Sequence, residues 1–195
     1  MAITYPLATP TSIGIESIEL RAVNSVATSQ SPYTYKQQIV SHGGQKWEAS
    51  VNIPSVRRDL AAGWKAMLVA LKGQEGTFLL GDPDYATPQG TVSSCVITGT
   101  AGNDSVTVVM TGTLKAGDYI QLGSGINSKL HQVLQDQSGN GTLEIWPPLR
   151  STYSSATAVF NSPKGVFRLA NNVTSWSINN ASSYGISFEA VEVIT

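Results

Sequence analysis

The chain has 195 residues, enough for one β-rich domain or two small ones. Charged residues make up only 13% of it and the formal net charge is −1, so its charge steers it neither to nucleic acid nor to an anionic membrane. With so few charges, uncharged polar residues must form most of the solvated surface. This composition suits a subunit that is covered by neighbours in an assembly, although an exported β-sandwich could share it. The single cysteine, Cys95, excludes an intramolecular disulfide, and we expect it to be buried.

Two β-prone runs precede the predicted helix. Residues 13–23 place apolar side chains two apart, with a change of phase that suits a bulge. We predict a loop over 24–32, which is polar and rich in serine, and a strand over 33–40. The paired glycines in 41–45 predict a tight hairpin turn, because glycine readily adopts the positive φ that such a turn needs, and a return strand follows.

A helical period begins at residue 55 and predicts a helix over 55–72. Its apolar residues recur every three or four positions, as on one face of an amphipathic helix. Ser55 is placed to cap its start, and Gly73 to end it in the left-handed conformation. Gly63 inside the helix costs about 1 kcal/mol relative to alanine, which suggests a close packing contact there. The stripe consists of Val56, Leu60, Trp64, Leu68 and Leu71.

Short β-prone runs separated by glycine-containing turns fill residues 88–161, which predicts a small closed barrel or compact sandwich. We expect the runs 77–80 and 165–169, on either side of it, to pair in one sheet. The predicted fold is therefore mainly β, with an outer β-sandwich and one helix from residues 1–87 and 162–195 and an inserted small β-barrel-like domain. The final strand is apolar on both sides near its end and should be central or covered. The predicted strands of the insert are 91–97, 105–110, 119–122, 129–134, 142–145 and 157–160.

The chain offers little for catalysis or metal binding. His42 and His131 are its only histidines, and neither has a motif-spaced partner, so we expect ordinary polar roles. Asp82 and Asp84 could contribute to a site for a hard cation, but a turn around the intervening proline is the favoured interpretation. The spacing of the Asp and Glu residues does not exclude the paired carboxylates of a glycan hydrolase, but it singles out no pair. We predict no catalytic residue, no metal and no cofactor.

Aromatic residues are the remaining candidates for a binding site. Trp146 ends a predicted strand of the insert, where it could form a sugar-stacking platform with Tyr119 and Tyr153. Packing in a core or between domains is the favoured alternative. The other three tryptophans lie at apolar positions of their elements and are predicted to be core residues: Trp47, Trp64 and Trp176.

Motifs of strands and turns run through most of the chain in a recognisable order. They are Ser31-Pro32-Tyr33-Thr34, Gln45-Lys46-Trp47-Glu48, the helix up to Lys72, Phe78-Leu79-Leu80-Gly81-Asp82-Pro83, Gly117-Asp118-Tyr119-Ile120-Gln121-Leu122-Gly123, Pro147-Pro148-Leu149-Arg150 and Phe167-Arg168-Leu169. Together they resemble the distal-tail proteins of long-tailed bacteriophages, which join the tail tube to the tail tip. The motifs contain no reactive centre, so no active site is carried over.

The resemblance implies a virion structural protein of the tail, made in the host cytoplasm. Proteins of this group form rings, commonly of six copies, around the tail channel and contact the tail tube on one face and the tail-tip hub on the other. The expected partners are therefore the chain itself, the tube and the hub, without sequence-specific nucleic-acid contacts or a membrane. The insert is small, which puts a full carbohydrate-binding domain in doubt. A free carbohydrate-binding or adhesion module and a glycan hydrolase are the alternatives.

Charges are scarce, so the places where they cluster are candidates for contacts between ring subunits. A ring needs two different surfaces on each subunit, because head-to-tail contacts close only at a suitable rotation. The candidate contacts lie at the start of the helix and in the turn after residue 80. They are Arg57, Arg58, Asp59, Asp82, Asp84 and Tyr85.

Overall fold

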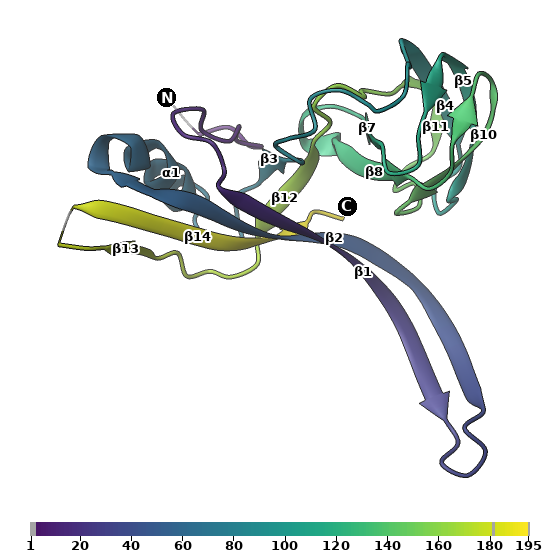
Figure 1. The fold of residues 1–195 in the computed structure, drawn as a ribbon, viewed down its shortest axis with the longest axis horizontal. Coiled ribbons are helices and arrows are strands. Elements are labelled where there is room, and N and C mark those ends of the chain that lie inside the picture. The colour runs from purple at the N-terminus through teal and green to yellow at the C-terminus, as the bar shows by residue number, and fades with distance from the viewer. Residues whose placement is uncertain (1–2, 181, 195) are drawn as a thin grey trace.

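The computed structural model describes residues 3–180 and 182–194. In this part of the chain the fold is mainly β, as predicted, with two six-stranded antiparallel sheets and one α-helix. A small two-stranded sheet pairs β6 (Thr113–Leu114) with β9 (Gln137–Ser138). Figure 1 shows the helix on the left, the second sheet at the upper right, and the hairpin formed by the first two strands of the first sheet running to the lower right.

The first sheet has the strand order β1-β2-β14-β12-β3, with β13 also paired to β14. The predicted pairing across the insert is confirmed, because Val166 of β12 lies opposite Leu79 of β3. The closing strand, β14, lies between β2 and β12 and is therefore central, as predicted. The strands of this sheet are β1 (Ser17–Gln30), β2 (Gln37–Arg57), β3 (Phe78–Leu80), β12 (Gly165–Leu169), β13 (Trp176–Ile178) and β14 (Ser183–Glu192).

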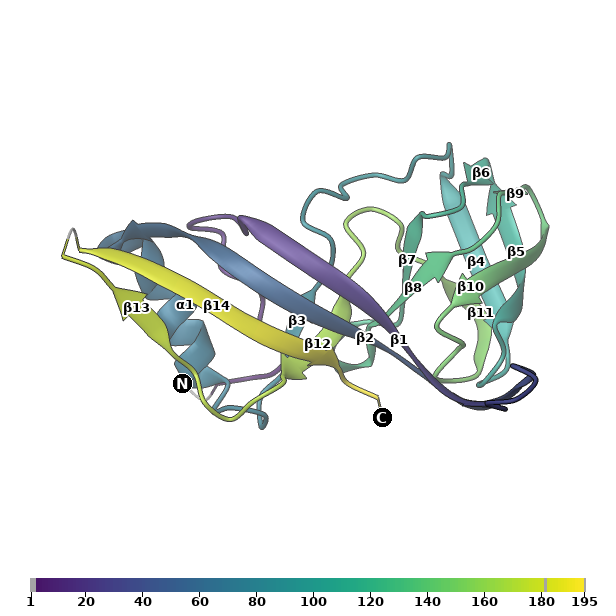
Figure 2. The same ribbon diagram turned by 60° about the horizontal axis from the view of Figure 1, so that its bottom comes forward.

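The second sheet has the order β11-β4-β5-β10-β8-β7 and curls around its own core (Figure 2). A bridge between Gln121 and Val159 links β7 to the segment that follows β11. A short 3₁₀ helix, η1 (Gly125–Asn127), connects β7 to β8. The strands of this sheet are β4 (Ser94–Gly99), β5 (Ser105–Thr111), β7 (Tyr119–Leu122), β8 (Lys129–Val133), β10 (Gly141–Trp146) and β11 (Tyr153–Thr157).

The predicted strands of this region agree with β5, β7, β8 and β10 to within one residue at each end. The prediction of 157–160 was wrong for β11, which ends where that run begins. Ser155 interrupts β11 with a positive φ of 57°, and the pairing with β4 shifts there, so the apolar period does not mark the strand. Cys95 in β4 is fully buried, as predicted, and burial raises the pKa of its thiol to about 11.

The helix α1 (Arg58–Ala70) packs on one face of the first sheet (Figure 1). It begins later than predicted because β2 continues to Arg57, and the Ser55 hydroxyl pairs with that of Ser183 instead of capping the helix. Leu60 was wrongly predicted to be core, since it is 37% exposed. The buried residues of the helix are Ala61, Trp64, Met67 and Leu68.

Two predicted glycine roles at the helix are confirmed. Gly73 has a positive φ of 68° just after the helix end. A Cβ added to Gly63 would lie 3.3 Å from the Ser12 hydroxyl and 3.5 Å from Pro10, so the N-terminal segment packs closely there. The same segment also reaches the last turn, where the Tyr5 hydroxyl donates to the Ala70 carbonyl at 2.6 Å.

The tryptophans divide differently from the prediction. Trp47 and Trp64 are buried core residues, as predicted. Trp176 is 38% exposed because β13 lies outside the core, with the ammonium of Lys65 5.8 Å from its ring. Its apolar position in the sequence period therefore does not make it a core residue.

The hairpin of β1 and β2 differs most from the sequence prediction. β1 continues through the predicted loop, and β2 runs unbroken through the predicted turn over 41–45. The turn lies instead at Ser31–Lys36, where the Ser31 amide donates to the Lys36 carbonyl at 3.0 Å and Tyr35 adopts a φ of 55°. Gly43, with a φ of 70°, lies in a bulge of β2, where the pairing with β1 shifts between Asn24 and Val26. Paired glycines supply the same backbone freedom to a bulge as to a turn, which explains the error.

Candidate assembly arm and its root

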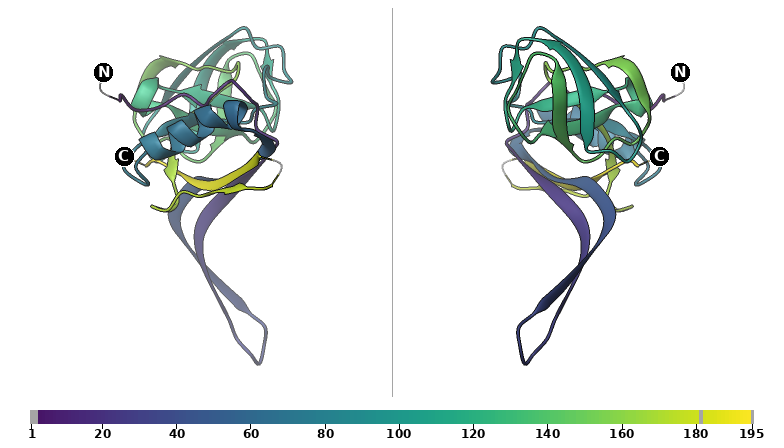
Figure 3. Two further views of the ribbon diagram at one scale, coloured as in Figure 1. Left: turned by 90° about the vertical axis from the view of Figure 1, so that its left-hand side faces the viewer. Right: turned by 90° about the vertical axis from the view of Figure 1, so that its right-hand side faces the viewer.

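The distal part of this hairpin, residues 24–45, projects from the body of the molecule and is here called the arm (Figure 3). Within residues 24–44 every side chain is exposed except that of Ser31. No other part of the described chain therefore covers either face of the ribbon (Figure 3). An isolated two-stranded hairpin is marginally stable at best in water.

Apolar side chains lie along the arm and at its turn. Ile39 is 64% exposed and Val40 is 46% exposed. As neighbours in a strand they point to opposite faces, so each face presents an apolar side chain. The other large exposed apolar residues of the arm are Val26, Tyr33 and Tyr35.

Charge is nearly absent from the arm. Between residues 24 and 45 the only Lys, Arg, Asp or Glu is Lys36, at the turn. Charged residues reappear where the ribbon joins the body, at Arg21 in β1 and at Lys46 and Glu48 in β2. The arm is thus a neutral surface on a ribbon whose base carries charges.

Two side chains hold the root of the arm, one from the end of β10 and one from the loop between β10 and β11. The Trp146 indole Nε1 donates to Asn24 Oδ1 at 3.0 Å, and Arg150 Nη2 donates to the Gln45 carbonyl at 2.6 Å. Asn24 and Gln45 lie opposite one another in the ribbon, so both strands are anchored at the same level. The direction in which the arm leaves the body is therefore set by the second sheet.

A buried ion pair supports this anchor. Arg150 Nη2 lies 2.9 Å from Glu192 Oε2, and the two side chains are only 10% and 2% exposed. The same carboxylate accepts the Trp47 amide at 3.0 Å. Close by, Lys129 Nζ donates to the Val193 carbonyl at 2.8 Å, and burial lowers the pKa of Lys129. The ion pair joins the second sheet to β14 and to the start of the arm.

Aromatic side chains fill the rest of the joint. The Trp47 ring packs edge to face on Trp146, with centroids 4.5 Å apart, and its Nε1 donates to the Leu130 carbonyl at 3.0 Å. Tyr119 lies 6.1 Å from Trp47 and 5.4 Å from Tyr85. These aromatic rings therefore pack against one another inside the molecule.

The three rings considered as a sugar-stacking platform are all half-buried. Tyr119 and Trp146 are half-buried and pack against the core of the first sheet. Tyr153 is also half-buried but packs against the core of the second sheet, and burial raises its pKa. Packing against a core, the favoured alternative, therefore accounts for each of the three rings.

The two histidines lie in different environments. His42 is exposed in the bulge of the arm. His131 in β8 is fully buried, and its Nδ1 lies 2.7 Å from the Pro147 carbonyl, which fixes the neutral tautomer with the proton on Nδ1. Burial lowers the pKa of His131 to about 4. Its role in the structure is therefore that of a packed, neutral side chain.

The charged group at the helix start lies at the end of β2 opposite the arm. Arg57 Nη2 is 3.7 Å from Asp59 Oδ2, and both side chains are well exposed. Arg58, the first residue of α1, is exposed beside them. β2 thus carries a neutral ribbon at one end and a charged, solvated surface at the other.

The predicted turn at Asp82–Asp84 is confirmed, because the Asp84 amide donates to Asp82 Oδ1 at 3.0 Å. Tyr85 has an internal contact as well, since its hydroxyl donates to Asp118 Oδ1 at 3.1 Å. The buried Asp118 carboxylate also accepts the amides of Gln89 and Lys115, each at 2.8 Å. Asp118 therefore fixes the segment that leads into the second sheet, a role that sequence spacing did not reveal.

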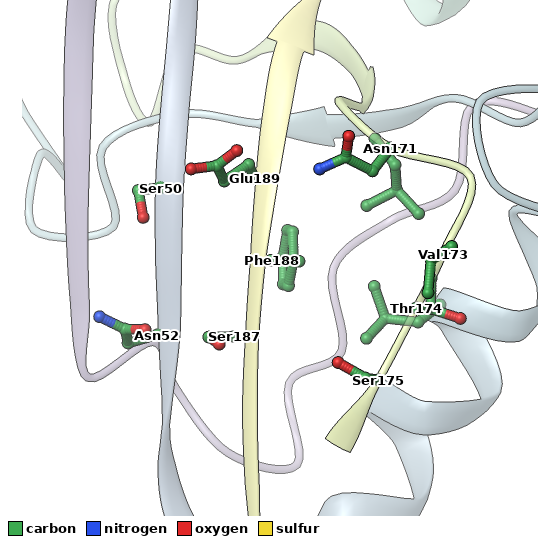
Figure 4. Close-up of a pocket in the computed structure, with 11 residues that line it drawn as sticks. Ser50, Asn52, Asn171, Val173, Thr174, Ser175, Ser187, Phe188 and Glu189 are labelled. Atoms are coloured by element: carbon green, nitrogen blue, oxygen red, sulfur yellow. The ribbon is translucent and has the colours of Figure 1, made fainter. Parts of the chain in front are cut away.

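A hollow of about 310 Å3 lies beside β14, below the segment that leads into β13 (Figure 4). Phe188 points into it, and Ser187 and Asn52 line it on the side of the sheet. The carboxylate of Glu189 on its rim lies 3.8 Å from Arg21. Its polar side chains are uncharged apart from Glu189 and none is buried, so they select no ligand chemistry.

Within residues 3–180 and 182–194, no three His, Cys, Asp or Glu side chains gather as a metal site would require. No helix in the described part of the chain has the length and hydropathy needed to cross a membrane. Comparison of the chain with models of known protein families and with curated proteins found no match.

Proposed function

We propose that the chain is a structural subunit that assembles with copies of itself into a ring, and that this ring connects the tube of a bacteriophage tail to the tail-tip hub. The observation that carries the proposal is the arm. It is a projecting ribbon that is exposed on both faces, bears apolar side chains on each face and is almost free of charge. A surface of this kind is stabilised when a protein partner covers it.

The way the arm is anchored also supports assembly. Trp146 and Arg150 hold its two strands at the root, and the ion pair of Arg150 with Glu192 is buried. An arm fixed in one direction loses less conformational freedom on binding than a free hairpin, which favours assembly with defined geometry. The position in a phage tail rests on the motif order described for the sequence.

The body offers a second, different surface, as a head-to-tail ring requires. The exposed charges of Arg57, Arg58 and Asp59 lie at the end of β2 away from the arm. With Asp82 and Asp84 they are candidate contacts to the next copy, to the tube or to the hub. Tyr85 would act there through the turn that it supports.

Electron microscopy of the purified chain, alone and mixed with the tube and hub proteins encoded beside it, tests this proposal. We expect closed rings that stack on the end of the tube. The matched variant replaces residues 25–44 by Asn-Gly, a two-residue turn that joins the paired residues Asn24 and Gln45 and keeps both root contacts.

This variant should be folded, because the replaced residues contribute nothing to either core, and it should form no rings. Intact chain that remains a monomer alone and with both partners would contradict the proposal. Rings of unchanged form from the shortened variant would show that the arm is not what holds them together.

A further inference from the structure

The arm leaves two strand edges without partners. β1 is the outermost strand of its sheet, and β14 pairs with β2 only from Glu48 onward. Within the described chain, no strand pairs with the outer side of either arm strand. Alternate residues along each of these edges direct their N–H and C=O groups away from the hairpin.

Soluble proteins commonly protect such edges with charges, proline or a very short strand. The part of β1 that borders the body follows this rule, because it carries Glu19 and Arg21. Beyond Val23 the same strand reads Asn-Ser-Val-Ala-Thr-Ser-Gln, with neither a charge nor a proline. On β2 the stretch from Gln37 to Gln45 also lacks both. Apart from the bulge near Gly43, such protection is therefore missing from the arm and present next to it.

We infer that the arms of successive copies pair edge to edge, with the β1 edge of one copy hydrogen-bonded to the β2 edge of the next. This inference rests on the proposed assembly and specifies its contact. The partner is a second copy of this chain, because one arm offers both complementary edges. β1 and β2 are antiparallel, so adding the next hairpin at the free edge continues an antiparallel meander from copy to copy.

The side chains of the arm suit this arrangement. A ribbon of two strands becomes a sheet of four or more when neighbours join it, which gives it the stability that an isolated hairpin lacks. Ile39 and Val40 project to opposite faces and would pack against β1 side chains of the neighbouring arm, where Val26 is also exposed. The contact is heterologous, and it closes into a ring only at a fixed rotation between copies.

Disulfide trapping with variants that each carry one added cysteine tests the pairing in the full-length protein. One set places cysteine on β1 (Ser25→Cys, Ala27→Cys and Ser29→Cys), and the other on β2 (Gln38→Cys, Val40→Cys and His42→Cys). All six positions are exposed, whereas Cys95 is buried with a raised thiol pKa and stays unreactive. Ser154→Cys, on an exposed site of β11, is the control for random collision.

We expect disulfide-linked dimers on oxidation when a β1 variant is mixed with a β2 variant, at least tenfold more than with Ser154→Cys. Crosslinks confined to single variants alone would mean symmetric β1–β1 or β2–β2 contacts and would overturn the inference. Assembled particles without any β1–β2 crosslink would overturn it too, while leaving the proposed assembly intact. Absence of particles by light scattering, from the chain alone and with the tube and hub proteins, would overturn both.

A charge on the arm provides an independent check. Ile39→Lys places a charge in each arm, where pairing would bury it against β1 of the next copy, so the concentration needed for assembly should rise at least tenfold. Val109→Lys changes a similarly exposed apolar residue of β5 and should have no effect. Equal assembly of the two variants would contradict arm pairing.

Discussion

Arg150 links the second sheet to the root of the arm through one buried guanidinium. In Arg150→Met the buried Glu192 carboxylate would lose the guanidinium and keep the Trp47 amide and the charge of nearby Lys129. Breaking a buried pair from one side costs about 3–5 kcal/mol. We expect a loss of this size in the free energy of unfolding, measured by urea denaturation.

The double variant Arg150→Met with Glu192→Gln is the control for this change. It keeps an acceptor for the Trp47 amide but takes the Glu192 charge away from the buried Lys129, so it should recover only part of the lost stability. If the free energy of unfolding of Arg150→Met lies within about 0.5 kcal/mol of that of the intact chain, the ion pair contributes nothing measurable to stability.

His131 gives the chain a predicted dependence on pH. Its pKa in the folded protein is about 4, below the ordinary value of 6.5, because burial disfavours the charged ring. Between these values the unfolded chain binds a proton that the native chain does not, so stability falls as the pH drops from about 6.5 to 4. The loss from this one group approaches about 3 kcal/mol, at 1.36 kcal/mol per pKa unit.

Urea denaturation at several pH values checks this contribution. His131→Gln should lose less stability than the intact chain between pH 7 and pH 4.5, whereas His42→Gln, changed at an exposed site, should follow the intact chain. Parallel curves for His131→Gln and the intact chain would show that the buried ring does not resist protonation.

At the scale of elements, α1 shows what a sequence period can determine. The period correctly identified a helix and the burial of Trp64 and Leu68. The period could not show that Leu60 lies outside the buried face, because the rotation of the helix depends on how it packs on the sheet. The start was missed for a related reason, since pairing with β14 carries β2 as far as Arg57.

The helix face gives a direct prediction of stability. Trp64→Ala should cost about 3–5 kcal/mol, because the ring is buried against Phe188 and its Nε1 donates to the Ile13 carbonyl at 3.2 Å. Leu60→Ala and Arg58→Ala, at exposed positions of the same helix, should cost far less. An unchanged denaturation midpoint for Trp64→Ala would contradict the packing of α1.

The arm shows what local sequence could not provide. Alternation, polar composition and paired glycines together indicated a turn over 41–45, but the same signals are compatible with a long ribbon that contains a bulge. Which arrangement forms depends on distant partners, because Trp146 and Arg150 fix the root from the second sheet. The candidate contacts at Arg57, Arg58 and Asp59 were visible as local charges, whereas the arm was not.

At the scale of the whole molecule, the chain leaves the first sheet after β3 and returns to it at β12. The two points lie together, since the Ser162 amide donates to the Ala86 carbonyl at 3.1 Å. A short Gly/Ser linker in place of residues 88–161 can therefore close the gap. We predict that the remaining residues fold, because most of the core between α1 and the first sheet comes from them.

This deletion should also lower stability, because Trp47 loses Leu130 and Trp146, and Glu192 loses Arg150. Far-UV circular dichroism and a cooperative denaturation curve are the measurements. A product without a cooperative transition would show that the region is not an insertion into a self-sufficient fold.

The most direct test of the central claim is the mass of the particle in solution, measured by light scattering for the intact chain and for the variant in which Asn-Gly replaces residues 25–44. We predict one closed oligomer of fixed subunit number for the intact chain and a folded monomer for the variant. A monomeric intact chain at every concentration tested, or an equal number of subunits in both particles, would contradict assembly through the arm.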